Sequence, residues 1–334
     1  LCVPLVRYAA FQIGILDFPK KHGMHSHPVP RLGGLVLYAA FVIGSLYRMD
    51  LNEMLKGVLL ASSLIFFLGL IDDLIHLRAG LKLIAQVLIC SVMMFKYGVI
   101  LHAFHNVFLN AFFTLLGIIG ITNAINFLDN MDGLAAGLVM ISSLAIFIVS
   151  RMTDQVWLGY LSMALVGANA GFLVFNLRKA YLFMGDSGST FLGFTLASLA
   201  VMCEWSSELA VTLAVPTLIM GVPILDMVLI TVLRAKEDKV RNLKEWIDYT
   251  GKDHFSHRLM RLGLGERGAV FFLWALQAFF CAAAVILISR KAFEGFLGLA
   301  FYTAVTLGTV VFFLRRRMLI VTLNPREVRR KVKR

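Results

Sequence analysis

Acidic residues lie at the ends of long apolar segments, where charged side chains are rarely tolerated. A carboxylate within or beside a membrane-spanning segment is costly and usually functional. The acids, and the histidines that accompany them, occur in five places: Asp72-Asp73 in Gly69-Leu-Ile-Asp-Asp-Leu; Asp129 and Asp132 in Asn126-Phe-Leu-Asp-Asn-Met-Asp-Gly133; Asp186 in Phe183-Met-Gly-Asp-Ser-Gly188; Asp226 after Pro223; and His254-Phe-Ser-His257-Arg258. Clustered carboxylates need a counter-charge, and a metal ion that also binds phosphates could supply it.

Each place also has a purely structural interpretation. The alternatives, in chain order, are a helix end or a pair with Arg78 for Asp72-Asp73, turn or N-cap positions for Asp129, Asp132 and Asp186, a hydrogen-bonding role for Asp226, and solvated side chains for His254 and His257. A common location for these segments would favour chemistry, because independent caps have no reason to converge.

The composition is that of a membrane protein. Apolar residues make up 59% of the 334 residues, mean hydropathy is +0.81, and charged residues make up 16%. Soluble domains carry about 25% charge. These values predict an all-α, polytopic transmembrane helical bundle of about 10–11 spans in a single domain, 1–334. The expected spans are 1–16, 33–48, 54–75, 81–97, 106–127, 133–150, 157–175, 187–203, 208–233, 268–289 and 295–314.

The eleven spans assign the loops to two sides. One side holds 17–32, 76–80, 128–132, 176–186, the long loop 234–267 and the basic tail 315–334. It carries 25 of the 32 Lys and Arg, the other side has six, and Arg7 lies inside the first span. This asymmetry places the first side in the cytoplasm. Because the sequence begins at Leu1 within an apolar stretch, we expect a truncated first span and no cleavable signal peptide.

The same topology brings the acids to one side. Asp72, Asp73, Asp129, Asp132 and Asp186 share the predicted cytoplasmic edge with the histidine loop. Mg²⁺ is held in proteins by one or two carboxylates together with substrate phosphates. The cations available for phosphates are Lys82, Arg178, Lys179, His257 and Arg258. The net charge of +12 is spread over loops and the tail, which indicates topology and lipid headgroups and no nucleic acid. The sequence therefore predicts a Mg²⁺-dependent phosphoryl-transfer site reached from the cytoplasm.

The chain resembles the polyprenyl-phosphate N-acetylhexosamine-1-phosphate transferases of glycosyltransferase family 4. The matching segments, in the family's order, are Pro28-Val-Pro-Arg31-Leu-Gly33-Gly34, Gly69-Leu-Ile-Asp72-Asp73, Lys82-Leu-Ile-Ala-Gln86, Asn126-Phe-Leu-Asp129-Asn-Met-Asp132-Gly133, Phe183-Met-Gly-Asp186-Ser-Gly-Ser and His254-Phe-Ser-His257-Arg258. They extend from residue 28 to residue 258.

The resemblance implies a reaction and its participants. A sugar 1-phosphate would pass from a UDP-N-acetylhexosamine to undecaprenyl phosphate, with release of UMP, in the cytoplasmic (inner) membrane of a bacterium. Mg²⁺ would be the cofactor, and Mn²⁺ could replace it. Membrane lipid would surround the protein, and a homodimer is one assembly that the family allows.

The resemblance also implies roles for individual residues. Asp72, Asp73 and Asp129 would be catalytic, and Asp186 and Asp73 would hold the metal. The residues implied in substrate binding are Lys82 at the lipid phosphate, Asn126 and Asp132 near the nucleotide, Phe183 stacked on uracil, and His254, His257 and Arg258 at the pyrophosphate or sugar. How base and metal-ligand roles divide among Asp72, Asp73 and Asp129 stays open.

Within the family, the Pro-Val-Pro-Arg-x-Gly-Gly segment is similar to the undecaprenyl-phosphate N-acetylglucosamine-1-phosphate transferase branch, which starts O-antigen, teichoic acid or related polysaccharides. The alternative is the phospho-N-acetylmuramoyl-pentapeptide transferase branch of peptidoglycan synthesis, which usually has three adjacent histidines where this chain has His254-Phe-Ser-His257. Two remoter alternatives are an ion-coupled transporter and an inactive scaffold. A transporter would place its acids near the membrane midplane in two related halves, which this sequence does not show.

Overall fold

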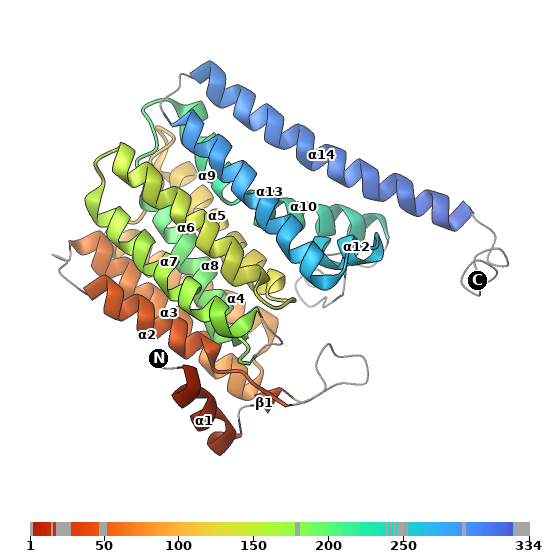
Figure 1. Ribbon diagram of the computed structural model, residues 1–334. Helices are drawn as coiled ribbons and strands as arrows, with labels where there is room; N and C mark the ends of the chain where they lie inside the picture. The colour runs from red at the N-terminus through yellow and green to blue at the C-terminus, as the bar shows by residue number, and fades with distance from the viewer. Residues whose placement is uncertain are drawn as a thin grey trace.

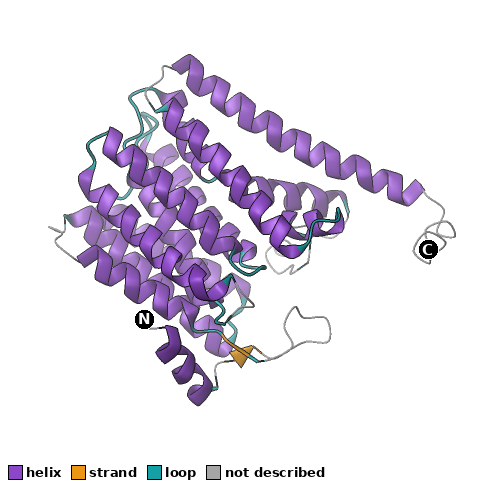
Figure 2. Ribbon diagram, in the orientation of Figure 1, coloured by secondary structure: helices purple, strands orange, loops and turns teal. Residues whose placement is uncertain are grey.

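The structure, a computed structural model, describes residues 3–14, 16–17, 28–46, 52–177, 181–237, 240, 242, 245, 251, 253–288 and 292–322. Most of this part of the chain is helical (Figure 2). The helices are α1 Val3–Ile13, α2 Gly33–Leu46, α3 Glu53–Ile75, α4 Ala79–Tyr97, α5 Val107–Leu128, α6 Leu134–Met152, α7 Val156–Asn176, α8 Gly185–Met202, α9 Leu209–Ile219, α10 Gly221–Lys236, α12 Phe255–Arg261, α13 Glu266–Leu287 and α14 Ala292–Thr322. A short antiparallel pair joins β1, Leu16–Asp17, to β2, Val29–Pro30.

Every predicted span contains a helix, so the prediction of a polytopic helical bundle is confirmed. Among the described residues, seven helices are long and apolar enough to cross a bilayer, or eight if the bent pair α9 and α10 is one span. The other predicted spans correspond to α1 with 11 residues, α2 with 14, and α8 with 18. The chain is therefore a multi-pass membrane protein with both crossing and shorter helices.

Helix α8 lies at the centre of the bundle, between α3, α5, α6 and α2 (Figure 1). From Ser187 to Ala200 every one of its side chains is buried. Neighbouring helices approach its first turn closely because glycines face it. A Cβ on Gly34 of α2 would lie 2.4 Å from the backbone nitrogen of Gly188, and one on Gly69 of α3 would lie 2.6 Å from the backbone oxygen of Asp186. These contacts fix the N-terminus of α8 against α2 and α3.

The segment before α2 pairs with the segment before α8. Phe183 N–H donates to the carbonyl of Pro30 at 2.8 Å, Gly33 N–H to that of Phe183 at 2.9 Å, and Gly34 N–H to that of Met184 at 2.8 Å. The Pro-Val-Pro-Arg-x-Gly-Gly and Phe-Met-Gly-Asp segments thus form one backbone unit, which positions Asp186.

The predicted span 208–233 is not one continuous helix, because it consists of two helices bent by 80° between Ile219 and Gly221. Pro223, in the first turn of α10, has no N–H for the carbonyl of Ile219, which favours a break here. Gln277 of α13 bonds the buried backbone groups at the break, since its amide donates to Ile219 O at 2.6 Å and accepts from Val222 N–H at 3.0 Å. Tyr302 of α14 donates to Gly221 O at 2.8 Å. The break directs α10 away from α9.

The C-terminal part of the chain contains helices where the sequence predicted a loop and a tail. The long loop 234–267 includes the end of α10 and the seven-residue helix α12, and α14 continues past the predicted span 295–314 to Thr322. Figure 1 shows α14 reaching beyond the end of the bundle. Residues 323–334 of the predicted tail lie outside the described residues.

Candidate active site

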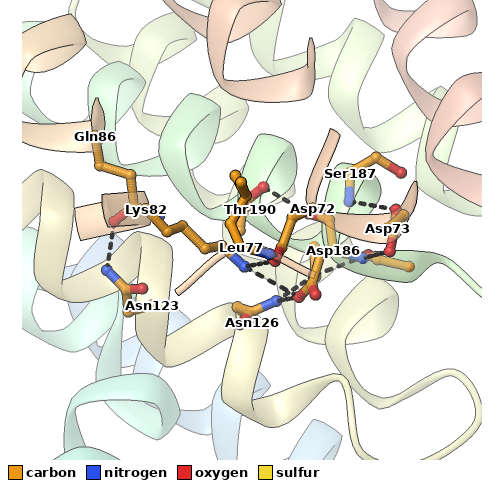
Figure 3. A network of polar contacts seen from close by, with 12 residues as sticks. Asp72, Asp73, Leu77, Lys82, Gln86, Asn123, Asn126, Asp186, Ser187 and Thr190 are labelled. Atoms are coloured by element: carbon orange, nitrogen blue, oxygen red, sulfur yellow. Dashed lines mark hydrogen bonds and ion pairs between the residues drawn. The ribbon is translucent and has the colours of Figure 1, made fainter. Parts of the chain in front are cut away.

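Acidic and amide side chains from four helices meet at one end of the bundle (Figure 3). Asp72 and Asp73 end α3, Lys82 begins α4, Asn126 ends α5, and Asp186 begins α8. The antiparallel course of these helices brings sequence positions up to 114 residues apart into hydrogen-bonding contact. The structure therefore brings these acids together, as the sequence predicted.

Lys82 joins two of the acids. Its Nζ lies 2.7 Å from Asp72 Oδ2 and 3.3 Å from Asp186 Oδ1. The other oxygen of Asp72 accepts the backbone N–H of Leu77 at 2.7 Å. Asp72 is thus the buried partner of Lys82, the cation that it binds where Arg78 was the alternative, and it also accepts a backbone N–H at the end of α3. A lysine held between two carboxylates presents a fixed positive charge beside Asp186.

Asp73 faces the N-terminus of α8. Its Oδ1 accepts the backbone N–H of Asp186 at 2.8 Å and its Oδ2 accepts that of Ser187 at 2.9 Å. Gly185 precedes this turn with φ +75°, and a Cβ there would lie 2.7 Å from Asp73 Oδ2. A carboxylate at a helix N-terminus satisfies N–H groups that have no partner inside the helix. This geometry gives Asp73 a positioning role for α8, while its predicted catalytic and metal-binding roles stay predictions.

Asp186 is more open to a ligand than Asp72. Its side chain is 39% exposed, whereas that of Asp72 is 9% exposed. Asn126 Nδ2 donates to Asp186 Oδ1 and, at 2.8 Å, to Ser189 Oγ. One turn before Asn126, Asn123 Nδ2 donates to the buried Gln86 Oε1 at 2.9 Å. Asp186 is therefore held from one side by Lys82 and Asn126, with part of its surface free to receive a cation.

Asp129 is the C-cap of α5 and lies next to the cluster. Burial, followed by the negative charges of Asp186, Asp73 and Asp132, raises the pKa of Asp129 to about 8. Asp132 lies in the same turn and is partly buried. Near neutral pH Asp129 is thus a carboxyl group able to gain or lose a proton, which is the property that acid–base chemistry requires.

The raised pKa of Asp129 makes a prediction about stability. Between the ordinary aspartate pKa of 3.8 and about 8, the unfolded chain loses a proton that the folded chain keeps, so stability should fall as pH rises through this range. Asp129→Asn removes the titration, and we expect it to be more stable than the wild type by more than ~1 kcal/mol at pH 8 and equal to it at pH 4. Thermal unfolding in detergent with EDTA, from pH 4 to pH 9, measures this. Parallel pH curves for the two proteins would contradict the shifted pKa.

Asn176, at the end of α7, links the two acidic loops. Its Oδ1 accepts the backbone N–H of Gly133 at 2.6 Å and its Nδ2 donates to the carbonyl of Leu182 at 3.0 Å. The side chain is buried. One residue thus sets the position of the Asp129–Asp132 turn relative to the segment that carries Asp186. Sequence reasoning missed it, because an Asn at a helix end has many ordinary uses.

We expect Asn176→Ala to lower the free energy of unfolding by ~2–4 kcal/mol, because it leaves one backbone N–H and one C=O buried without partners. Asn169→Ala is a matched control: Asn169 lies on the same helix, is also buried, and donates only to Leu165 O of its own helix at 2.8 Å. Its loss should cost half as much or less in the same thermal unfolding assay. Equal losses would show that Asn176 does not link the loops.

The histidine segment begins α12 and is held by α10. His254 Nδ1 lies 2.7 Å from Asp226 Oδ2, and Phe255 N–H donates to Asp226 Oδ1 at 2.6 Å. Arg234, near the end of α10, bonds Asp253 through Nε at 2.9 Å and Nη2 at 2.8 Å. Sequence reasoning treated Asp226 in isolation and missed Arg234 and Asp253. Arg234 ends an apolar run and Asp253 lies in a polar loop, so neither position carries a distinctive signal.

Helix α12 also contacts the acidic loop after α5. Ser256 Oγ donates to Asn130 Oδ1 at 2.8 Å, and the His254 ring lies 5.7 Å from that of Phe127 between centroids. His257 and Arg258 are partly buried, and Arg258 Nε donates to Asp253 O at 2.7 Å. His254 is thus brought next to the segment that carries Asp129, whereas Arg258 supports the start of α12.

Two other predictions concern Phe183 and the pair Arg178 and Lys179. Phe183 contributes backbone hydrogen bonds, and its partly buried ring leaves uracil stacking a prediction. Arg178 and Lys179 lie outside the described residues.

The acids fit a metal that takes most of its ligands from substrate. Within the described part of the chain, no three His, Cys, Asp or Glu side chains are placed to hold an ion together. A cage made of protein ligands alone therefore does not fit here. Mg²⁺ bound through one or two carboxylates, phosphates and water does fit, because Asp186 is partly exposed beside the cluster.

Comparisons with known proteins identify the family of the chain. The sequence pattern of glycosyl transferase family 4 matches residues 55–204, which include Asp72, Lys82 and Asp186. The chain is 32% identical over 299 residues to a probable undecaprenyl-phosphate N-acetylglucosaminyl 1-phosphate transferase of Bacillus subtilis (strain 168), covering 86% of this chain and 82% of the relative.

Two further relatives have related activities. A decaprenyl-phosphate N-acetylglucosaminephosphotransferase of Mycolicibacterium smegmatis is 31% identical, with 93% of this chain and 85% of the relative covered. A phospho-N-acetylmuramoyl-pentapeptide-transferase of Caldicellulosiruptor bescii is 30% identical, with 87% and 93% covered. All three names describe transferases.

Proposed function

This chain belongs to glycosyl transferase family 4, in the undecaprenyl-phosphate N-acetylglucosaminyl 1-phosphate transferase branch, and from this premise we propose that it transfers N-acetylhexosamine 1-phosphate from a UDP-sugar to undecaprenyl phosphate. Undecaprenyl-diphosphate-sugar and UMP are the products. The observation that carries the proposal is the cluster in which Lys82 lies between Asp72 and Asp186, at the end of the bundle where the loops of four helices meet.

The site's charges suit a reaction between two anions. An oxygen of the lipid phosphate attacks the β-phosphorus of the UDP-sugar, the bond from that phosphorus to the bridging oxygen breaks, and UMP leaves with the electron pair. One phosphoanhydride replaces another, so no separate energy source is required. Lys82 carries the positive charge nearest to Asp186 and would bind the lipid phosphate, while Asp72 fixes the ammonium group.

Each acid then has a distinct proposed role. Asp186 would hold Mg²⁺, which when bound neutralises phosphate charge and polarises the phosphoryl oxygens. Asp73 keeps the first turn of α8, and with it Asp186, in place. Asp129, with its pKa near 8, would take the remaining proton of the lipid phosphate. Asn126 orients the Asp186 carboxylate, and His254 would meet the diphosphate of the donor.

Access from the cytoplasm is part of the proposal. The loops that carry the acids belong to the side predicted to be cytoplasmic, which holds 25 of the 32 Lys and Arg. UDP-sugars are cytoplasmic metabolites. The lipid acceptor would reach the same edge from within the bilayer. These features support a place in the bacterial inner membrane at the first membrane step of a cell-envelope polysaccharide.

A donor panel tests the proposal. Purified protein with Mg²⁺ and undecaprenyl phosphate is incubated with UDP-N-acetylglucosamine, UDP-N-acetylgalactosamine and UDP-N-acetylmuramoyl-pentapeptide, and UMP is measured. We expect release from an N-acetylhexosamine donor, dependent on the lipid. Release from the pentapeptide donor alone would move the chain to the function of the C. bescii relative. No UMP from any donor, with the fold intact, would overturn the enzyme assignment.

A further inference from the structure

Helix α10 carries two buried charged side chains that both hold the start of α12. Asp226 is fully buried, at 0% exposure, and Arg234 is 1% exposed. A buried charge is stable only when it is paired and hydrogen-bonded. Their partners are three consecutive residues, Asp253 for Arg234, and His254 and Phe255 for Asp226. Both pairs therefore converge on one short segment of chain.

Helix α12 depends on this support. It has seven residues, and a helix of this length is not stable in isolation. Asp226 uses one oxygen for the ring of His254 and the other for the N–H of the first helical residue, Phe255. The same carboxylate thus starts the helix and fixes the imidazole that precedes it.

The contact decides which nitrogen of His254 faces a substrate. Nδ1 is bonded to Asp226 at 2.7 Å, so any bond from the imidazole to a substrate uses Nε2. A carboxylate acceptor requires a proton on Nδ1, and this holds for the neutral ring and for the imidazolium alike. The ring lies beside Phe127, two residues before Asp129, so Nε2 belongs to the same end of the bundle as the acids.

We propose that Asp226 is a positioning residue, which acts through His254 by fixing Nδ1 and leaving Nε2 for the diphosphate of the donor. This inference rests on the proposed function for the identity of the ligand. The bend between α9 and α10 is what makes the arrangement possible, because it brings a residue of an interrupted helix to the loop that carries the histidine. Neither the carboxylate nor the imidazole alone would specify the orientation.

A double-mutant cycle tests the proposal. Asp226→Asn keeps the size of the side chain but offers an amide donor to Nδ1, which favours the opposite ring tautomer. We expect it to lower kcat/KM for the UDP-sugar ~10- to 100-fold in the wild-type background. In a His254→Ala background the same change should cost less than ~2-fold. Asp154→Asn, in the exposed turn between α6 and α7, is the charge-matched control and should leave activity unchanged. An equal loss in both backgrounds would overturn the proposal.

A second measurement requires no activity. In protein labelled with ¹⁵N-histidine, the signals of His254 are identified by their absence from His254→Ala. We expect Nδ1 to carry a proton in the wild type and to lose it in Asp226→Asn. An Nδ1 without a proton in the wild type would overturn the proposal. If no donor yields UMP but Nδ1 is protonated as expected, the proposed function fails and the Asp226–His254 assignment stands.

Discussion

Asp186→Asn should abolish turnover while leaving the fold intact. The substitution keeps the shape of the side chain but removes the negative charge of an acid with 39% of its side chain exposed. Without this charge the site loses its proposed metal ligand, whereas Lys82 keeps its 2.7 Å bond to Asp72. We expect UMP release to fall by at least ~10³-fold, equivalent to ~4 kcal/mol of transition-state stabilisation.

The measurement is the rate of UMP release at saturating donor and lipid, together with thermal unfolding in detergent. Asp154→Asn serves as the control, because it also neutralises one acid but lies in an exposed turn at the opposite end of α6. Its rate should equal that of the wild type. Near-normal turnover by Asp186→Asn would remove Asp186 as the metal ligand and, with it, the proposed arrangement of the site.

Lys82→Met should have the second largest effect, and it should act on both activity and stability. The change removes the cation that lies 2.7 Å from Asp72 and 3.3 Å from Asp186. Asp72 is then a buried carboxylate without a counter-charge, which typically costs 3–5 kcal/mol, and we expect a loss of about that size in stability. We also expect kcat/KM for the lipid phosphate to fall ~10²- to 10³-fold, with Lys82→Arg retaining part of the activity because it keeps the charge.

Lys56→Met provides a matched control for the removal of an ion pair. Lys56 Nζ lies 2.7 Å from Glu53 Oε1, the same distance as in the buried pair, but the two side chains are 50% and 72% exposed. Exposed pairs contribute little, so stability should change by less than ~1 kcal/mol and activity should not change. A Lys82→Met protein with unaltered kinetics for the lipid phosphate would show that Lys82 is a structural counter-ion only.

The helices could be predicted because apolar segments of bilayer length are a strong signal. What the sequence could not show was where such a segment breaks. The segment 208–233 is mostly apolar and contains two prolines, Pro216 and Pro223, but only Pro223 lies next to the break. The bent backbone is bonded by Gln277 and Tyr302, which lie on later helices. Likewise α8 reads as one span among others, and its central position follows only from the glycines of α2 and α3 that face it.

The residues of the site could be predicted from the sequence, but the individual role of each residue could not. The order of the predicted spans was enough to bring Asp72, Asp129 and Asp186 to one side. It could not show that Asp73 accepts the N–H groups of α8 while its neighbour Asp72 binds Lys82. These roles depend on side-chain direction at the end of α3. Asp226 could not be assigned for a similar reason, since its partners lie 28 and 29 residues away across a loop.

The central claim is that the cluster brings two phosphates together and moves a sugar 1-phosphate, and the fate of the β-phosphorus tests it most directly. UDP-N-acetylglucosamine labelled with ³²P in the β-phosphate is incubated with the protein, Mg²⁺ and undecaprenyl phosphate. We predict that the label appears in the lipid fraction, one equivalent for each UMP released, and that none stays with the nucleotide product. Label recovered in UDP, with unlabelled sugar on the lipid, would show that the sugar alone is transferred and would contradict the account.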